Sequence, residues 1–172
     1  MQKIFSYPLK LEDMSSLTQK YRLEANSDEL DYITEIMKVP SVKNFSAEIT
    51  VKLYKKEHLL EVKGFVDADV EQVSVISLES FIKPYHNEFS LKFDTKMTQN
   101  DIKEIDFEYD DELLDILDNG QIDLASIAME HLALVLDDFP RKEGEEFSFI
   151  SEFDEETTEA NNPFAVLKKL KK

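Results

Sequence analysis

The sequence predicts an α+β fold: a twisted antiparallel sheet with two main helices packed on or beside it and a C-terminal tail helix. Three observations lead to this prediction. Apolar and polar residues alternate with a period of two in the middle of the chain, apolar residues recur at helical spacing in two other segments, and a short basic, apolar segment ends the chain. Whether the sheet closes into a barrel is left open, as is the order of its strands.

The chain is predicted to form one domain followed by a tail. Its 172 residues are 42% hydrophobic and include 12 Phe, which suffices for one core. We predict a single α+β domain over residues 1–142, an acidic linker over 143–161 and a basic C-terminal motif over 162–172. The linker prediction rests on an acidic run from Glu143 to Glu159 that contains no basic residue.

The first predicted helix follows a strand candidate at residues 21–25. Asn26 supplies a capping side chain, and the acids that follow it face the positive end of the helix dipole. Leu30 and Ile33 then recur at helical spacing. We expect Pro40 to end this helix, because proline disfavours the α conformation of the residue before it.

The clearest strand runs from Phe45 to Leu53, where apolar residues take every second position. A turn at residues 55–58 separates it from a second alternating run, from Leu60 to Ala68. Because a period of two places alternate side chains on opposite faces of a sheet, these runs predict an antiparallel hairpin.

Three further strands are predicted after the hairpin, at residues 72–78, 89–93 and 105–109. The first of them is rich in β-branched residues, which favour strands. An acidic segment that extends to residue 118 predicts a short helix, which Asn119-Gly120 closes.

Asp123 is predicted to cap the second main helix, which we expect to run through Leu136. The apolar residues of this segment recur at helical spacing and define one buried face. We expect Pro140 to end the helix, and the basic pair Arg141-Lys142 lies just past its negative pole.

The net charge of −17 favours basic partners. Such a charge repels phosphates at long range, so unassisted binding to RNA should be weak and sensitive to salt. A small basic protein is the natural partner of such a surface. The alternative interpretation is that the charge serves solubility alone.

The composition argues against several kinds of chemistry. Without cysteine, disulfides and thiolate-ligated zinc are excluded, and 3 Gly leave no glycine-rich phosphate loop. The histidines, His58, His86 and His131, have no second ligand at zinc spacing. We therefore predict no metal, no cofactor and no enzyme activity. A hydrolase that uses Asp67 and Asp69, or His131, is the weaker alternative.

The chain has no apolar run long enough to span a membrane and no apolar signal-like segment at its start. The absence of cysteine fits a reducing compartment. We therefore expect a cytoplasmic protein without membrane contact, and the sequence does not predict its oligomeric state.

Three segments carry information beyond packing. The first places Gly64, Ala68 and Gln72 at four-residue spacing, and the second carries Asp123 and Glu130 in the pattern Asp-Leu-x-x-Ile-x-x-Glu-x-Leu-x-Leu. The third is the tail, with the pattern Asn-Pro-Phe-Ala-x-Leu-x-x-Leu. In this order the segments resemble the YceD family, over about residues 20–171. The matching tail residues are Asn162, Pro163, Phe164, Ala165, Leu167 and Leu170.

The resemblance implies a role in the accumulation of large-subunit ribosomal RNA. We therefore predict a non-enzymatic factor in bacterial large ribosomal subunit biogenesis. Its partner is either ribosomal RNA or a basic ribosomal protein, and in the second case it acts as an acidic chaperone without RNA contact. Direct RNA contact needs basic residues. The candidates are Arg141, Lys142, Lys168 and Lys169.

One feature departs from the family pattern. Many members have a cysteine just after the middle Gln, and this chain has Val73-Ser74 there. Any role of that thiol, including ligation of zinc, is therefore absent from this chain.

Each motif position also has a purely structural interpretation. Gly64 allows close approach of two backbones, and Gln72 satisfies a backbone group. Asp123 caps a helix, and Glu130 forms a salt bridge. The tail is either a helix that closes the fold or one that docks on a partner. We favour a partner, because the acidic linker would hold the tail away from its own domain.

Overall fold

The computed structural model describes residues 4–15, 17–96, 114–117 and 119–146. The chain divides into two compact units, Met1–Lys142 and Glu143–Lys172. The predicted division of the second part into a linker and a basic motif falls, beyond residue 146, outside the described residues and stays a prediction.

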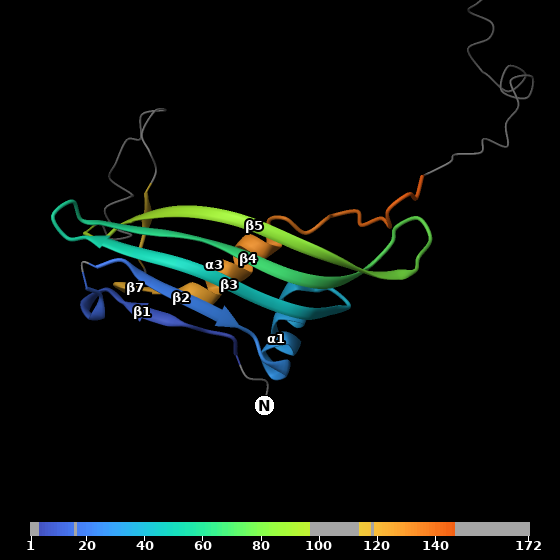
Figure 1. The fold of residues 1–172 in the computed structure, drawn as a ribbon, viewed down its shortest axis with the longest axis horizontal. Coiled ribbons are helices and arrows are strands. Elements are labelled where there is room, and N and C mark those ends of the chain that lie inside the picture. The colour runs from blue at the N-terminus through green and yellow to red at the C-terminus, as the bar shows by residue number, and fades with distance from the viewer. Residues whose placement is uncertain (1–3, 16, 97–113, 118, 147–172) are drawn as a thin grey trace, which may run out of the picture. The chain divides into compact units, whose positions relative to one another are not determined.

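The first unit is built on a five-stranded sheet with the strand order β2-β3-β4-β5-β6 (Figure 1). Its first four strands are antiparallel neighbours, whereas β6 pairs in parallel with β5. The predicted α+β class is confirmed, but the sheet is mixed rather than wholly antiparallel. Over the described residues it does not close into a barrel. The strands are β2 (Gln19–Glu24), β3 (Ser41–Tyr54), β4 (Leu59–Val73), β5 (Ser80–Asp94) and β6 (Asp115–Ile116).

A second, two-stranded sheet joins the N-terminal segment to the segment before the last described helix. Strand β1 (Pro8–Lys10) pairs antiparallel with β7 (Gln121–Asp123), with Leu9 opposite Ile122. The short 3-10 helix η1 (Leu11–Asp13) follows β1. None of this pairing was predicted, because strands this short show no periodicity.

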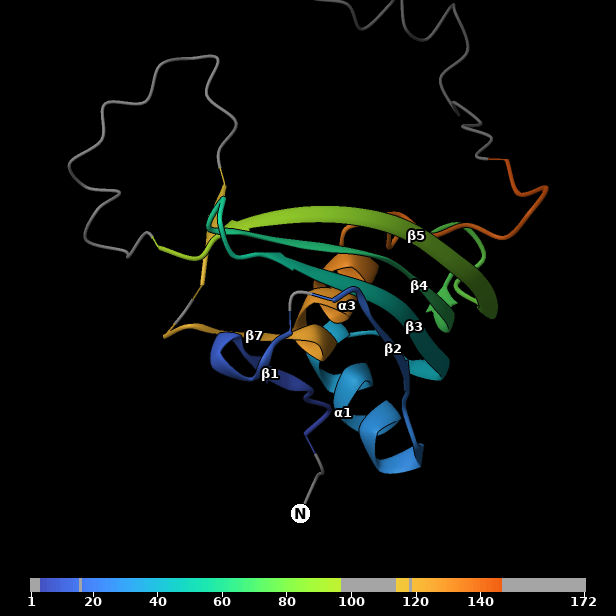
Figure 2. The ribbon, with the colours of Figure 1, turned by 60° about the vertical axis from the view of Figure 1, so that its left-hand side comes forward.

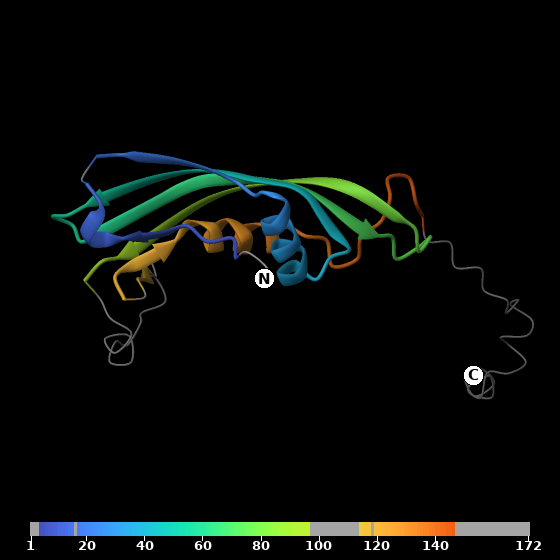
Figure 3. The same ribbon diagram turned by 90° about the horizontal axis from the view of Figure 1, so that it is seen from below.

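The predicted hairpin is confirmed as β3 and β4, and its alternation explains the core. In β3 the side chains from Phe45 to Leu53 at every second position are buried, and in β4 the same holds for Val66, Ala68 and Val70. Two helices cover this face, α1 (Ser27–Met37) on β3 and α3 (Leu124–Ala133) on β4 and β5. Figures 2 and 3 show both helices on the same side of the sheet. The opposite face carries no helix within the described part of the chain.

Helix α1 begins as predicted, but a left-handed residue, and not Pro40, ends it. The Asn26 side chain accepts hydrogen bonds from the backbone N–H groups of Asp28 and Glu29, and the Glu29 carboxylate accepts one from the Asn26 N–H. This reciprocal pair is a capping box. The helix ends at Met37 because Lys38 takes the left-handed conformation (φ 55°), two residues before Pro40.

Helix α3 is shorter than predicted. Asp123 caps it, as expected, but it ends at Ala133 rather than at Leu136. The chain then turns, with the Val135 N–H bonded to the Leu132 carbonyl. It runs beside the loop that follows β4, where the Val75 N–H donates to the Pro140 carbonyl. Pro140 therefore lies in this contact and does not end the helix.

The predicted strand at residues 72–78 is wrong. Strand β4 continues to Val73, and the next residues turn because Ser74 bonds its own neighbours. Its hydroxyl accepts from the Ile76 and Ser77 N–H groups, at 3.1 and 3.3 Å, and its carbonyl accepts from Leu78 N–H. Such side-chain bonds compete with a sheet ladder. The strand predicted at 89–93 exists, but β5 already begins at Ser80.

The acidic segment is only partly described. The strand predicted at residues 105–109 lies outside the described residues, as does the acidic segment up to residue 113. Asp115–Ile116 is strand β6 and not the end of a helix. Asn119 and Gly120 form the expected turn, both with positive φ. No helix among the described residues has the length and apolar character needed to cross a membrane.

Gly64 lies opposite Ile49 in the pairing of β3 with β4, at a point of close backbone approach. A Cβ atom at this position would lie 2.3 Å from the Glu48 backbone oxygen. Backbone atoms cannot yield as the end of a side chain can, so any larger residue must push the two strands apart. The structural interpretation of Gly64 therefore has a direct basis in the sheet.

We predict that Gly64→Ala destabilises the domain by about 1–3 kcal/mol, the usual cost of overpacking. The free energy of unfolding, measured in urea, checks this. Lys63→Ala changes the adjacent, exposed residue and should shift stability by no more than about 0.5 kcal/mol. A Gly64→Ala protein as stable as Lys63→Ala would show that the strands separate at little cost.

Candidate functional site

A cleft lies where the C-terminal ends of α1 and α3 meet the end of β4. Its volume is about 660 Å³. We call it the α1–α3 cleft. Its lining is largely apolar, with acidic residues at one side. The residues that line it include Ile36, Val39, Gln72, Val73, Met129, Glu130, Ala133, Leu136, Asp137, Asp138 and Pro140.

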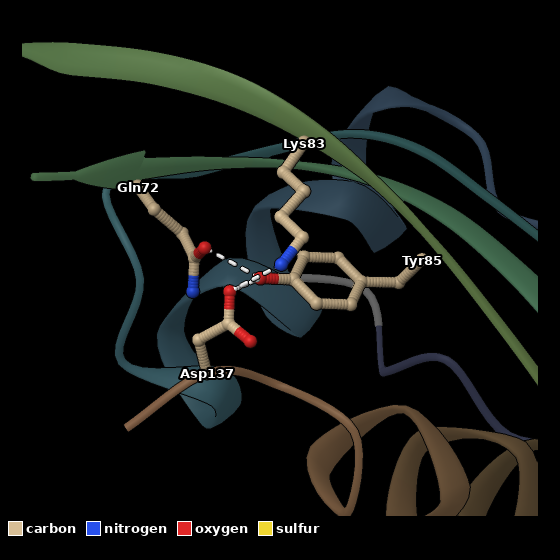
Figure 4. Close-up of polar contacts among 4 residues, drawn as sticks. All are labelled: Gln72, Lys83, Tyr85 and Asp137. Atoms are coloured by element: carbon tan, nitrogen blue, oxygen red, sulfur yellow. Dashed lines mark hydrogen bonds and ion pairs between the residues drawn. The ribbon is translucent and has the colours of Figure 1, made fainter. Parts of the chain in front are cut away.

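A polar network of four residues lies beside this cleft (Figure 4). The Tyr85 hydroxyl is 2.5 Å from Gln72 Oε1 and 3.1 Å from Asp137 Oδ2. The Lys83 ammonium donates to the same Asp137 oxygen at 2.5 Å. Gln72 is only 4% exposed, so its side-chain amide must find partners within the protein. The network ties β4, β5 and the segment after α3 to one another.

The charges of the network are fixed by these contacts. The hydrogen bond from Lys83 holds the pKa of the Asp137 carboxyl below its ordinary value. Burial is the main cause that raises the pKa of Tyr85 to about 12. The tyrosine is therefore protonated and the aspartate ionised at neutral pH. Since the phenol has a single proton, it donates to Gln72 or to Asp137 at any one moment.

Two of the predicted motif residues meet in the cleft although they are far apart in sequence. Gln72 closes the end of β4, and Glu130 lies on α3 with its side chain exposed. Among the described residues, the Glu130 carboxylate forms no hydrogen bond or ion pair, so the salt bridge expected for it is not found. Gln72 and Glu130 thus line the same cleft, the first as a buried, hydrogen-bonded amide and the second as an exposed carboxylate.

The other motif residues of the described chain hold the fold. Gly64 and Ala68 lie on β4, the first at the close approach to β3 and the second buried at 3% exposure. Asp123 Oδ1 accepts from the N–H groups of Ala125 and Ser126, at 2.9 and 3.2 Å. The same oxygen accepts from Tyr7 N–H at 2.9 Å. Asp123 therefore fixes both the start of α3 and the N-terminal segment.

The predicted basic contacts differ in their surroundings. Arg141 is exposed, whereas the Lys142 ammonium is hydrogen-bonded to the Glu79 carboxylate. Lys142 thereby fastens the segment after α3 to the loop between β4 and β5. Lys168 and Lys169 lie outside the described residues, as do Asn162, Pro163, Phe164, Ala165, Leu167 and Leu170.

The three histidines have different surroundings. His131 stacks on Phe89, with ring centroids 4.4 Å apart, and burial lowers its pKa. His86 Nδ1 lies 2.7 Å from Asp67 Oδ1, a contact that raises the pKa of this imidazole. His58 lies in the turn between β3 and β4. Over the described ranges, no three His, Asp or Glu residues gather where they could hold a metal ion.

Sequence reasoning missed Lys83, Tyr85 and Asp137. One signal was available: Gln72 is a polar residue in an otherwise apolar series of alternate positions on β4. A buried amide in such a series needs a polar partner. The identity of that partner depends on the register of β5 and on the path after α3, which periodicity does not determine.

A family model described as "Large ribosomal RNA subunit accumulation protein YceD" matches residues 62–171. The matched range contains Gln72, Asp123 and Glu130. Neither the curated proteins nor the solved structures give a significant match.

We predict that Tyr85→Phe destabilises the domain by about 1–3 kcal/mol, because it removes the donor that satisfies the buried Gln72 oxygen. Urea unfolding at neutral pH measures this. The control is Tyr7→Phe, which removes the hydroxyl of a residue that is 41% exposed and should have little effect. Equal, small losses in the two variants would show that Gln72 does not depend on Tyr85.

The network also makes stability depend on pH. The pKa of Asp137 is lower in the folded chain than its ordinary value of 3.8, so its ionised form stabilises the fold. This contribution is fully present above 3.8 and is lost as the pH falls through the lower, folded-state value. We therefore predict that Asp137→Asn is less stable than the wild type at neutral pH and that the difference shrinks as the pH drops below 3.8. Urea titrations at a series of pH values measure it, with Asp138→Asn as the control for net charge. A difference that is independent of pH would contradict the ionic role.

Proposed function

The chain belongs to the YceD family of large ribosomal RNA subunit accumulation proteins, and from this we propose that it is a non-enzymatic factor in the biogenesis of the bacterial large ribosomal subunit. In this role it supports the accumulation of large-subunit ribosomal RNA in the cytoplasm. The observation that carries the proposal is the family match, which spans β4, α3 and the tail motif.

The roles of the motif residues support a non-catalytic function. Gly64 and Asp123 are engaged in strand pairing and helix capping, and Gln72 is hydrogen-bonded by a neutral tyrosine. Catalytic acids and bases are usually held with a pKa near the working pH. Tyr85 and Asp137 are shifted away from neutrality, in opposite directions, so this network is suited to holding a shape.

The protein reaches its RNA target either directly or through a basic ribosomal protein. Several cations of the described domain are already paired with acids. Arg22 contacts Glu24 at 2.7 Å, and Lys63 contacts Glu61 at 2.6 Å. A phosphate would have to compete with these carboxylates and with a net charge of −17. These observations favour the second route, in which the protein acts as an acidic chaperone.

Deletion of the gene for this protein tests the function in the organism that carries it. We predict that the ratio of large-subunit to small-subunit ribosomal RNA falls, because the family role is to support accumulation of the former. The two RNAs are quantified in wild-type, deletion and complemented strains. A complementing His131→Asn protein should restore the ratio if no catalysis by this histidine is involved.

An unchanged ratio in the deletion strain, at both slow and fast growth, would contradict the proposed function. A complementing His131→Asn protein that is stable and yet inactive would revive the enzyme alternative. Tight binding of the purified protein to a bare ribosomal RNA fragment, insensitive to salt, would favour the direct route over the chaperone.

A further inference from the structure

We propose that the α1–α3 cleft is the docking site for a short, basic, amphipathic segment of a protein partner. The segment would place apolar side chains in the cleft and its Lys or Arg side chains against the acidic rim. This inference deepens the proposed function and rests on it only for the identity of the partner as a ribosomal protein.

The first argument is the concentration of exposed apolar side chains around the cleft. Ile36 is 52% exposed and Val73 38% exposed, and both line it. The loop beside it exposes Val75, whose N–H is bonded to Pro140, a lining residue. Exposed apolar side chains grouped at one cleft favour a site of protein interaction.

The volume of the cleft suits such a ligand. About 660 Å³ lies within the range of about 300–1,000 Å³ that is typical of ligand pockets. Val39, Met129, Ala133 and Leu136 supply apolar walls. Transfer of a peptide's apolar side chains from water into the cleft would contribute favourable free energy to binding.

The acidic residues determine what kind of segment fits. Glu130, Asp137 and Asp138 line the cleft on the side of α3, and Lys38 is the one basic residue among its described lining. Lys83 neutralises Asp137, which leaves the exposed carboxylates of Glu130 and Asp138 to face a ligand. Together with the net charge of −17, these carboxylates attract a basic segment and repel phosphate.

The wall of the cleft is held in place before any ligand binds. The segment after α3 is fixed to β5 by the ion pair of Asp137 with Lys83, and to the loop after β4 by the hydrogen bond from Val75 to Pro140. The Lys142–Glu79 contact fastens its far end. A preformed wall reduces the ordering cost of binding. The polar network therefore acts as a support for the docking site.

The test uses the full-length protein and a synthetic helical peptide with Leu on one face and Lys on the other. A scrambled peptide of the same composition, without the apolar face, is the reference. Binding is followed by calorimetry or fluorescence anisotropy at two salt concentrations. We expect the amphipathic peptide to bind at least about tenfold more tightly than the scrambled one.

Two matched pairs of variants locate the binding. Ala133→Trp fills the cleft from an exposed position at the end of α3, and Ser90→Trp adds the same ring to an exposed position of β5. Ile36→Gln removes an exposed apolar side chain from the cleft, and Leu17→Gln removes one, 76% exposed, from outside it. We expect about tenfold weaker peptide binding for Ala133→Trp and for Ile36→Gln, and no change for the two controls.

A third pair tests the charge. Glu130→Gln with Asp138→Asn should weaken binding of the peptide and lower its salt dependence. The double variant Glu57→Gln with Glu88→Gln makes the same change of net charge away from the cleft. It should weaken peptide binding less and lower its salt dependence less.

Several outcomes would overturn the proposal. The first is equal affinity of the protein for the two peptides. The second is peptide binding that neither Ala133→Trp nor Ile36→Gln weakens. The third is binding of a single-stranded RNA oligonucleotide that both variants abolish. If Ala133→Trp does not fold, Ile36→Gln decides. Because these measurements use purified protein, they are independent of the ribosomal RNA ratio. If deletion leaves the ribosomal RNA ratio unchanged but the purified protein binds the peptide as expected, only the proposed function is refuted. If deletion lowers the ratio but the peptide does not bind in the cleft, only the docking site is refuted.

Discussion

The structure depends on one constraint: the long strands β3, β4 and β5 have one face that must be covered. Side chains from Phe45 to Leu53 and from Leu60 to Val70 alternate between this face and the opposite one, so the register of the sheet decides which residues form the core. A shift of one residue would expose every apolar side chain of a strand. Both described helices lie on this face for that reason, and Gly64 keeps the two strands at the distance that the register requires.

The cleft arises where this cover ends. Strand β4 extends to Val73, and residues of α1, of α3 and of the segments that follow these helices line the cleft at its end. Gln72 takes the last inward position of the strand, where its buried side-chain amide accepts a hydrogen bond from the Tyr85 hydroxyl. A buried amide bonded to Tyr85, and Asp137 beyond it, seal this end of the core with polar groups. Apolar side chains just outside the seal, Ile36 and Val73, stay exposed at the proposed docking site.

The regular part of the fold was predictable and the irregular part was not. Alternation over residues 45–53 and 60–68 sufficed for the hairpin, and Asn26 and Asp123 marked the helix starts. The strand expected at residues 72–78 failed because the Ser74 hydroxyl bonds two following amides, an interaction that β-branched composition does not reveal. The site was half visible: Gln72 and Glu130 were named, whereas Tyr85 and Asp137 meet only through the pairing of β4 with β5 and the path after α3.

The motif residues separate into those that the fold needs and one that it does not. Gly64, Asp123 and Gln72 each have a structural reason for their identity in this chain. Glu130 has none among the described residues: its side chain is exposed on α3 and lines the cleft, beside apolar side chains. An acid held in this position, on a protein that already carries an excess of charge, adds little to solubility. Its position is explained if a basic segment docks against it, because one carboxylate next to an apolar cleft fixes the orientation of a ligand that the apolar surface alone would leave free.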